Sequence, residues 1–557
     1  MTGADLLVAS LEDQGIEAVF NIPGFGILPF VEAVHQSDTL RHVTSLNETA
    51  LGFIAEGYSR ATRQPAFLNV YQSTGTGFVL PALQVAWGER TPLVMSTTTN
   101  SRQLQGRDQY AAVPDRITES TGQYTKWGFE VPTVDRIPEA VNRAVTIATT
   151  PPMGPVHLAF PMDLYESQAD LDNVDNRYGT TTTYSDTSPD SEAIQRVAEV
   201  LTNSSNRLVL AGSEAGKHNS TDEIIEFAEY TQSAVVAEGK RSYLPFPNDH
   251  PLFVGHSTGG DYSSASAAVE DAELLIFVGF ELTETVRNQY NLFDTDKTIV
   301  QIATTAHDIG KQVVPDIALV GHPGRILEAI NRTVSAEGPE SFDDADQFVS
   351  RHRKAYETRV ERERQLLADR MSGERPTPLE AIVENLREVV GDGLTVFHDA
   401  GDEIPFMDLV SFDSPDEFYG ISMKSSVQGW AIPAGIGAQI GAPEREVVIF
   451  EGDGGFMFSG PNALYTASKL DLPVLVIVLN NQGWRAGGYN DKIGIGWESE
   501  MFLGRFTNPE INFTQLAAAL GVNSFTVDDS EDARDVLQAA CAAEGPSLIE
   551  VATGYRP

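Results

Sequence analysis

The run VVIFEGDGG at residues 447–455 decides the fold class of this 557-residue chain. Its apolar half predicts a buried parallel strand, and the strand delivers Asp453 between glycines. A helical segment follows, and a second apolar run, VLVIVLNN at residues 474–481, ends in two asparagines. Two strands joined by a helix form a right-handed βαβ unit, whose strands end at the same edge of a parallel sheet. We therefore expect Asp453 and Asn481 to lie near each other at that edge, where open α/β sheets bind their ligands.

The glycines around Asp453 point to a phosphate ligand. A turn without side chains lets the backbone approach a phosphate closely, and the helix that follows offers its N-terminus to the anion. The Asp453 carboxylate, the Asn481 amide oxygen and a backbone carbonyl at Gly483 would supply three hard oxygen ligands, which suit Mg²⁺. A Gly-Asp-Gly turn alone would fit an ordinary glycine-rich loop, but the asparagine pair that ends the next strand favours the metal and phosphate site. The glycines concerned are Gly452, Gly454 and Gly455.

The same alternation of short β-rich runs and helical patterns divides the rest of the chain. A first α/β unit covers residues 1–166, a second covers residues 191–335, and a third covers residues 376–557. A polar stretch, residues 167–190, separates the first two, and a charged stretch, residues 338–375, predicts a solvated helix that links the last two. Strands that alternate with helices form parallel sheets with helices on both faces. We predict three doubly wound parallel-sheet domains of the α/β class.

The charge balance excludes two classes of partner. Asp and Glu total 79 against 38 Lys and Arg, which gives a formal net charge of −41. A field this negative argues against nucleic acid and against anionic membranes, because phosphate binding needs clustered cations. Only nine of the 38 basic residues are lysines, and an acidic, lysine-poor surface is typical of a protein that works at very high salt. A merely acidic protein from ordinary conditions is the alternative.

Cysteine usage and apolar runs indicate the compartment. Cys541 is the only cysteine, which excludes an intrachain disulfide and a cysteine zinc site. The first residues lack the basic region and long apolar run of a secretory signal. No stretch of 18 or more apolar residues predicts a membrane-spanning helix. We expect a soluble cytoplasmic protein.

The Gly-Asp-Gly strand end with its Asn-Asn partner resembles the cofactor motif of thiamine-diphosphate-dependent enzymes. The similarity is to the superfamily of acetolactate synthase, pyruvate oxidase and benzoylformate decarboxylase, and it leans towards the last. It covers nearly the whole chain in the same order of domains. The resemblance therefore implies a pyrimidine-binding first domain, a Rossmann-like central domain and a diphosphate-binding third domain. The similar stretches of the first domain are Val19–Gly24, Asn47–Ala61, Pro65–Val70 and Gly75–Gly77.

The resemblance also assigns roles to single residues. Glu48 matches the glutamate whose carboxyl bonds the aminopyrimidine N1′ and favours the imino tautomer that takes the proton from thiazolium C2. Gln428 stands where a bulky aliphatic side chain usually props the cofactor in its bent conformation, and the Ser426 carbonyl should meet the 4′-amino group. Asp399 and Asp402 lie where relatives touch the diphosphate, so only backbone N–H groups should bind it there. The residues implied for the diphosphate and the metal are Gly452, Asp453, Gly454, Gly455, Asn481 and Gly483.

The substrate end departs from the resemblance. Benzoylformate decarboxylase-like enzymes line the pocket with two histidines and a serine, and the corresponding positions here hold Tyr71, Val286 and Phe25. None of the ten histidines replaces them by local alignment. Arg287 or Arg485 could hold a substrate carboxylate bidentately, and an ordinary surface arginine is the alternative for each. The candidate pocket residues are Phe25, Tyr71, Gln72, Gln109, Arg287, Trp484 and Arg485.

These expectations describe a homodimeric or homotetrameric enzyme that uses thiamine diphosphate and Mg²⁺ to decarboxylate a small-molecule substrate, a 2-oxo acid, with release of an aldehyde or carboligation. An acetolactate synthase-type catalytic subunit is the alternative within the class. Such synthases bind FAD in the middle domain, but residues 191–335 show no clear glycine-rich fingerprint, so FAD stays an unsupported alternative. A non-catalytic cofactor-binding or regulatory protein is the alternative from another class. A nicotinamide dehydrogenase would need a Gly-x-Gly-x-x-Gly after a strand, and none stands in a convincing context.

Overall fold

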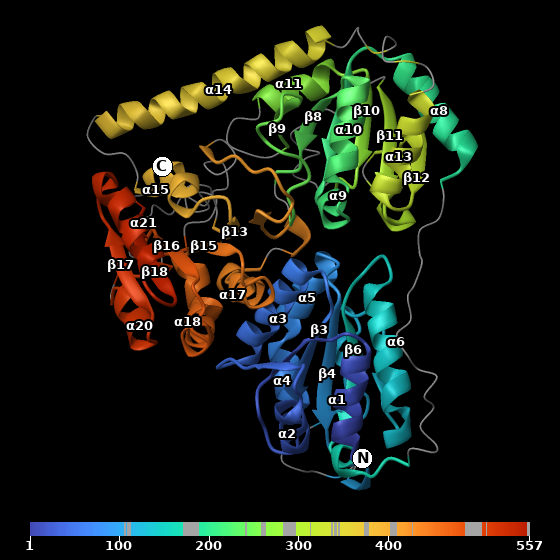
Figure 1. Ribbon diagram of the computed structural model, residues 1–557, viewed down its shortest axis with the longest axis vertical. Helices are drawn as coiled ribbons and strands as arrows, with labels where there is room; N and C mark the ends of the chain where they lie inside the picture. The colour runs from blue at the N-terminus through green and yellow to red at the C-terminus, as the bar shows by residue number, and fades with distance from the viewer. Residues whose placement is uncertain are drawn as a thin grey trace. The chain divides into compact units, whose positions relative to one another are not determined.

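The computed structural model describes most of the chain (Figure 1). The chain divides into two compact units. One consists of Met1–Tyr184, Lys424–Thr526 and Ala539–Pro557, and the other of Ser185–Met423 and Val527–Gln538. The residues outside the described part are 105–106, 108–112, 171–188, 240–241, 258–262, 282–296, 312, 336–337, 339–341, 343–345, 373–377, 401–408, 426, 485–503, 508 and 554–557.

The first sheet has six strands in the order β2-β1-β3-β4-β6-β5, and its pairings are parallel. Helices α1, α2 and α6 share one apolar core with this sheet, while α3 packs against α5 and β3. The strands are β1 Ala18–Asn21, β2 Arg41–Val43, β3 Ala66–Tyr71, β4 Leu93–Thr99, β5 Gly128–Glu130 and β6 Val156–Pro161. The helices are α1 Gly3–Asp13, α2 Leu28–Gln36, α3 Glu48–Thr62, α4 Gln72–Phe78, α5 Leu80–Gly88, α6 Ile137–Thr149 and α7 Asp163–Glu166.

The second sheet has the order β12-β11-β10-β7-β8-β9, so the direction of the strand order reverses between β7 and β10. Its strands are β7 Arg207–Ala211, β8 Ala234–Ala237, β9 Phe253–His256, β10 Leu274–Val278, β11 Thr298–Ala303 and β12 Ile317–Val320. The helices are α8 Ser191–Thr202, α9 Ser213–Lys217, α10 Thr221–Thr231, α11 Ser263–Asp271, α13 Pro323–Val334 and α14 Asp346–Ser372.

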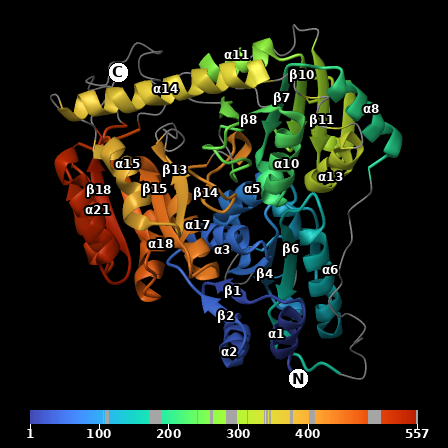
Figure 2. The same cartoon turned by 45° about the horizontal axis from the view of Figure 1, so that its top comes forward.

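The charged stretch that predicted a solvated helix contains α14, which runs alongside α11 (Figure 2). One face of α14 is not solvated, because Phe348, Tyr356 and Val360 pack into the apolar core of the second sheet. The sequence did not predict this buried face, because apolar residues are sparse among the charged residues of the stretch. The helix is therefore a part of the second unit's core as well as a connection.

The third sheet has the order β14-β13-β15-β16-β18-β17. Together the three six-stranded sheets confirm the predicted α/β class. Among the described residues, no helix has the length and apolar character needed to cross a membrane. The strands are β13 Leu394–Asp399, β14 Phe418–Tyr419, β15 Glu446–Gly452, β16 Leu475–Asn480, β17 Asn523–Val527 and β18 Ser547–Ala552. The helices are α15 Pro378–Val390, α17 Ala431–Gly441, α18 Asp453–Lys469, α20 Phe513–Ala519 and α21 Ala533–Ala542.

Helices α3 and α17 pack at very close distance because both carry glycine at the contact. A Cβ at Gly57 would lie 2.0 Å from the Ala434 carbonyl oxygen, and a Cβ at Gly437 would lie 1.9 Å from the carbonyl oxygen of Ile54. Any side chain at either position would push the helices apart. The two glycines therefore set the distance between α3, which begins at Glu48, and α17.

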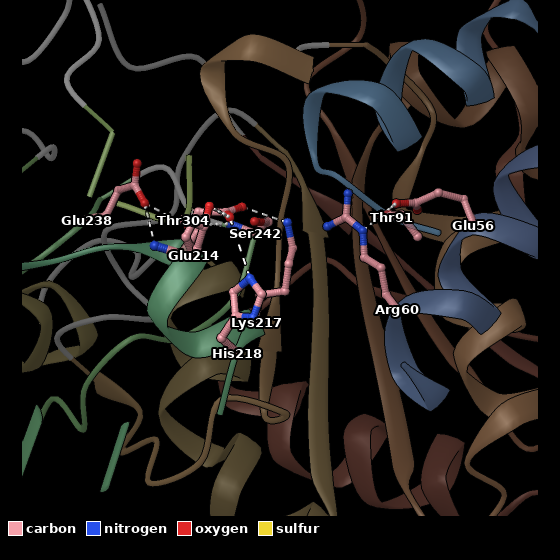
Figure 3. Close-up of polar contacts among 10 residues, drawn as sticks. Glu56, Arg60, Thr91, Glu214, Lys217, His218, Glu238, Ser242 and Thr304 are labelled. Carbon is pink, nitrogen blue, oxygen red and sulfur yellow. Dashed lines mark hydrogen bonds and ion pairs between the residues drawn. The ribbon is translucent and has the colours of Figure 1, made fainter. Parts of the chain in front are cut away.

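A buried polar cluster fixes this helix pair. Glu56 receives hydrogen bonds from Arg60 Nε at 2.5 Å, from Thr91 Oγ1 at 2.8 Å and from Trp430 Nε1 at 2.8 Å (Figure 3 shows the first two). The Arg60 guanidinium lies 4.6 Å from the centre of the Trp430 ring. Glu56 and Arg60 are fully buried, so their charges are compensated inside the cluster.

Arg207 in β7 anchors the ends of two helices of the second unit. The side chain is fully buried, and its guanidinium donates to the carbonyls of Thr231 at 2.9 Å, Leu201 at 3.2 Å and Phe342 at 3.2 Å, and also to Ser204. Leu201 and Thr231 lie in the last turns of α8 and α10, where carbonyls lack helical partners. The negative ends of the two helix dipoles also stabilise the positive charge of Arg207.

We expect Arg207→Met to lower the free energy of unfolding of the second unit by about 3–5 kcal/mol, because several buried carbonyls lose their donors together. Arg196→Met on α8, where the arginine is exposed, should change it by less than about 0.5 kcal/mol. Urea unfolding of both variants measures the difference. Equal stability of the two variants would contradict the anchoring role.

Candidate active site

Glu48 is the first residue of α3 and stands beside the end of β3. Asn47 caps the helix, since its Oδ1 accepts a hydrogen bond from the Ala50 N–H at 2.8 Å. A Cβ at Gly75 in α4 would lie 3.4 Å from Glu48 Oε1, so the half-buried carboxyl rests against the first turn of α4. Thr49 Oγ1 donates to the Phe78 carbonyl at 2.6 Å and ties α3 to the other end of α4. The predicted catalytic carboxyl is therefore held between two helices.

Asp453 lies where the sequence placed it, at the end of β15 and the start of α18. Its Oδ1 accepts from the Gly454 N–H at 2.7 Å and its Oδ2 from the Gly483 N–H at 2.9 Å. The residue is 2% exposed, and burial raises the pKa of its carboxyl despite these backbone hydrogen bonds. A cation beside this carboxylate would stabilise its ionised form, which burial disfavours.

The predicted neighbour relation of the two motif strands is confirmed. β15 pairs with β16 in parallel, and Gly452 lies opposite Leu479, so both strands end at one edge. A turn with φ +63° at Gln482 and +146° at Gly483 then folds back onto Asp453. Only glycine adopts the second of these conformations readily.

The two asparagines that end β16 differ in their partners. Asn480 donates to Glu550 Oε1 at 2.7 Å and accepts from the Gln482 N–H at 3.0 Å. The Oδ1 of Asn481 is buried and has no hydrogen-bond partner among the described residues. Asn480 therefore has a structural role, whereas the Asn481 amide oxygen is left without a partner in the part of the chain that the structure describes.

These donors fit a magnesium ion with a diphosphate. Mg²⁺ takes hard oxygens, and Asp453 and Asn481 supply a carboxylate and an unpartnered amide oxygen. Among the residues that the structure describes, no group of three or more His, Cys, Asp or Glu side chains could hold a metal. A metal at this edge would therefore take its remaining oxygens from the backbone, from phosphate and from water.

The turn at Gln428 and Gly429 lies against the first turn of α18. Gly429 has φ +79°, and its carbonyl accepts a hydrogen bond from Ser459 Oγ. A Cβ at Gly455 would lie 2.1 Å from Glu451 Oε1 and 3.3 Å from the Gly429 nitrogen, so the turn tolerates no side chain there. Gln428 is exposed beside this turn. The structure thus brings Gln428 next to the predicted diphosphate glycines.

Trp484 covers the glycine turn from outside. A Cβ at Gly454 would lie 2.5 Å from Trp484 Cζ3, so the indole packs directly on the backbone there. Its ring centre lies 5.6 Å from those of Phe458 and Phe506. The indole is 38% exposed and forms an apolar rim beside Asp453.

The candidate pocket residues of the first domain gather at the end of β3. A Cβ at Gly24 would lie 3.3 Å from Tyr71 Cγ, which places the turn before Phe25 beside Tyr71. Gln72 is 1% exposed, has φ +49°, and donates from Nε2 to Asn100 Oδ1 at 2.8 Å. The predicted residues Gln109, Arg287, Ser426 and Arg485 lie outside the described part of the chain.

Carboxylates occupy the edge of the second sheet where its strand order reverses. Glu238 Oε2 accepts from the Ser213 N–H at 2.7 Å and from the Ser213 hydroxyl at 2.8 Å. Glu214 accepts from Lys217 Nζ at 2.8 Å and from Thr304 Oγ1 at 3.0 Å. The backbone is tight as well, since a Cβ at Gly212 would lie 2.2 Å from the Phe280 Cα.

Sequence reasoning missed the groups that support the site. Glu56 and Trp430 lie 374 residues apart, and neither belongs to a strand end or a glycine turn. The available signal was an acidic and a basic residue four apart within a helix whose other side chains, apart from Glu48, are mostly apolar or small. Such a pair predicts a buried compensated charge, but its third partner cannot be found without the fold.

Three family models match the chain in the order of its sheets. The thiamine pyrophosphate enzyme N-terminal TPP binding domain matches residues 1–118, the central domain matches residues 194–330, and the C-terminal TPP binding domain matches residues 403–551.

Curated relatives align over nearly the whole chain. A probable acetolactate synthase large subunit of Methanocaldococcus jannaschii is 24% identical, over 99% of this chain and 92% of its own length. Acetolactate synthase 2 of Brassica napus is 28% identical over 99% of this chain and 85% of its own, and the Escherichia coli isozyme 1 large subunit is 25% identical over 99% and 93%.

Solved structures share the fold. A thiamine diphosphate-dependent 4-hydroxybenzoylformate decarboxylase of Rhodococcus jostii superposes with a TM-score of 0.83 at 23% identity over 100% of both chains. A benzoylformate decarboxylase of Polynucleobacter necessarius superposes with a TM-score of 0.81 at 22% identity, over 100% of this chain and 99% of its own.

Proposed function

This chain belongs to the superfamily of thiamine-diphosphate-dependent enzymes, and we propose that it decarboxylates a 2-oxo acid with thiamine diphosphate and Mg²⁺. The observation that carries the proposal is the buried Asp453 at the start of α18, which accepts the Gly483 N–H from the loop after β16, where the Oδ1 of Asn481 has no partner among the described residues. Asp453, Asn481 and the Gly483 carbonyl would hold the metal. The glycine backbone and the N-terminus of α18 would hold the diphosphate.

When bound, the cofactor supplies a nucleophilic carbon and takes up the electron pair that CO₂ leaves behind. Glu48 would hold and move a proton at the aminopyrimidine N1′ as a general acid and base. Trp484 excludes water from one side of the glycine turn. Tyr71 and Gln72 would contact the substrate, with Phe25 as an apolar wall, and Gln428 would prop the cofactor.

We propose that the enzyme works as a homodimer or homotetramer. Leu46 and Phe78 beside Glu48 are 53% and 54% exposed, and Met457 and Phe458 in the helix of Asp453 are 42% and 55% exposed. Large apolar side chains gathered around a site are typical of an interface. A second copy of the chain would cover them, and light scattering of the purified protein tests this.

The central domain is proposed to carry no flavin. At the switch point where an α/β sheet binds a dinucleotide, the Glu238 carboxylate already accepts the Ser213 N–H, and Glu214 is paired with Lys217. A pyrophosphate placed there would meet the Glu238 carboxylate and find the Ser213 N–H already used. We expect the purified protein to show no flavin absorbance and no activation by added FAD, and a stoichiometric flavin would contradict this.

A substrate screen tests the proposed reaction. Pyruvate, branched and aromatic 2-oxo acids are offered in molar KCl and in low salt, with aldehyde and acyloin products separated. Aldehyde release favours a decarboxylase like the structural neighbours, and acyloin formation favours a synthase like the curated relatives. If thiamine diphosphate binds but no acid yields CO₂, the chain is a non-catalytic cofactor-binding protein. The net charge of −41 supports the proposal that the protein works in a cytoplasm of high salt. We therefore expect higher activity in molar KCl than in low salt.

A further inference from the structure

His157 lies in β6 and is completely buried. Its Nε2 is 2.8 Å from Thr97 Oγ1 on β4, and its Nδ1 is 2.8 Å from the hydroxyl of Thr121, which ends a short helix at Ile117–Thr121. Burial lowers the pKa of the ring to about 3, so the ring is neutral at neutral pH. One ring nitrogen therefore donates a hydrogen bond and the other accepts one.

The hydrogen bonds continue from Thr97 to the first turn of α4. Thr97 Oγ1 lies 2.9 Å from Thr76 Oγ1, and Thr76 Oγ1 donates to the Gln72 carbonyl at 2.8 Å. Each hydroxyl has a single hydrogen. When Thr76 donates to Gln72, Thr97 must donate to Thr76, and His157 Nε2–H must donate to Thr97. The tautomer of His157 therefore sets the direction of every bond up to α4.

The other tautomer of His157 reverses the direction of these hydrogen bonds and donates to Thr121 instead. With the proton on Nδ1, His157 donates to Thr121, whose hydroxyl then donates to the Thr118 carbonyl at 3.1 Å. The Thr76 hydroxyl must then turn towards Thr97 and away from Gln72. A neutral ring has one N–H, so it cannot donate to both Thr97 and Thr121. The hydrogen bond from Thr76 to the Gln72 carbonyl is 2.8 Å long and is shorter than the one from Thr121 to the Thr118 carbonyl, at 3.1 Å.

The first turn of α4 needs such support because its backbone is strained. Gln72 has φ +49°, a conformation that residues with side chains rarely adopt. Gly75 is tightly enclosed, since a Cβ there would lie 2.9 Å from Val70 Cβ and 3.4 Å from Glu48 Oε1. The carboxyl of Glu48 thus rests on the turn that Thr76 holds against β4. A shift of this turn would shift the surface behind Glu48.

We propose that His157, Thr97 and Thr76 form a positioning chain that holds the α4 turn in the place where Glu48 needs it. His157 and Thr97 act through Thr76, without contact to Glu48 themselves. The proposal rests on the proposed function, in which Glu48 moves a proton on the cofactor.

Two matched variants separate positioning from mere stability. Thr97→Val and Thr121→Val each remove one hydroxyl, keep the shape, and leave one nitrogen of the same buried ring without a partner. Only Thr97→Val breaks the path to α4. The measurements on the holoenzyme are the melting temperature, kcat and KM for the 2-oxo acid, and the Kd of thiamine diphosphate in Mg²⁺ by calorimetric titration.

We expect both variants to melt at similarly lowered temperatures. Thr97→Val should lose about tenfold in kcat and raise the cofactor Kd several-fold at unchanged substrate KM, because a small misplacement of a catalytic group is costly. Thr121→Val should keep kcat and Kd within about twofold of wild type. Thr97→Ser retains the hydroxyl and should restore both values.

Equal losses of kcat in the two valine variants, or no rescue by Thr97→Ser, overturn the positioning chain. If Thr97→Val does not fold, Thr76→Val breaks the last link alone and should show the same loss. If the wild-type chain turns over no 2-oxo acid, the proposed function fails. In that case the cofactor Kd alone tests the positioning chain. A Kd that increases only in Thr97→Val supports the positioning chain, and equal Kd values in the two valine variants refute it.

Discussion

Replacing Glu48 with glutamine should lower 2-oxo acid turnover at least about a hundredfold while thiamine diphosphate still binds. The amide keeps the size of the side chain and can still bond a ring nitrogen, but it cannot hold and release a proton. General acid–base groups contribute about 10²- to 10⁴-fold to a rate. Steady-state kinetics and a calorimetric titration of the cofactor on the same preparation give both quantities.

Glu56→Gln is the matched control, because Glu56 lies on the same helix and is fully buried in the cluster with Arg60. Removing its charge breaks the buried ion pair with Arg60 and should cost about 3–5 kcal/mol of stability. Turnover per folded molecule should stay near that of wild type. If Glu48→Gln loses stability and keeps its turnover, the two roles have been assigned to the wrong residues.

The fold could be predicted from the sequence because parallel strands are buried on both faces. The residues Val447 to Phe450 in β15 and Val476 to Val478 in β16 are all buried, and such strands appear as unbroken apolar runs. Chain order and right-handed crossovers then bring Asp453 and Asn481 to one edge without further information. That part of the site follows from local sequence and general topology.

The support of the site could not be predicted, because it depends on contacts between elements. Trp430 reaches Glu56 only through the close packing of α3 on α17, which glycines allow and no apolar period signals. The strained φ of Gln72 follows from the turn after β3, and a glutamine there gives no warning of it. His157 has the same appearance in the sequence as any histidine in an apolar strand. Its two threonine partners come from different elements.

Replacing Asp453 with asparagine should abolish cofactor-dependent stabilisation and leave the cofactor-free protein within about 1 kcal/mol of wild type. Burial raises the pKa of this carboxyl, so its ionised form is penalised in the folded chain. Stability from this group is greatest below its unfolded pKa and decreases as pH rises through the folded value. A neutral amide removes this penalty, which offsets the loss of one backbone hydrogen bond.

With Mg²⁺ and thiamine diphosphate at a hundred times Kd, the wild-type protein should gain about 2.7 kcal/mol. Asp453→Asn should gain nothing measurable, and a chelator should return wild type to its cofactor-free melting temperature. An equal gain in both proteins would show that the diphosphate binds without the metal carboxylate.

The two neighbouring asparagines make this test specific to the metal. Asn481→Ala removes an amide whose Oδ1 has no partner among the described residues, so stability should change little while the Kd of the Mg²⁺–cofactor pair increases at least about tenfold. Asn480→Ala removes the bonds to Glu550 and to the Gln482 N–H, so it should lower stability by about 1–2 kcal/mol. Its effect on the Kd should be smaller, since its oxygen already accepts a hydrogen bond. If Asn480→Ala raises the Kd more than Asn481→Ala, the metal takes its amide oxygen from the other asparagine, and the loop after β16 must turn differently when the cofactor binds.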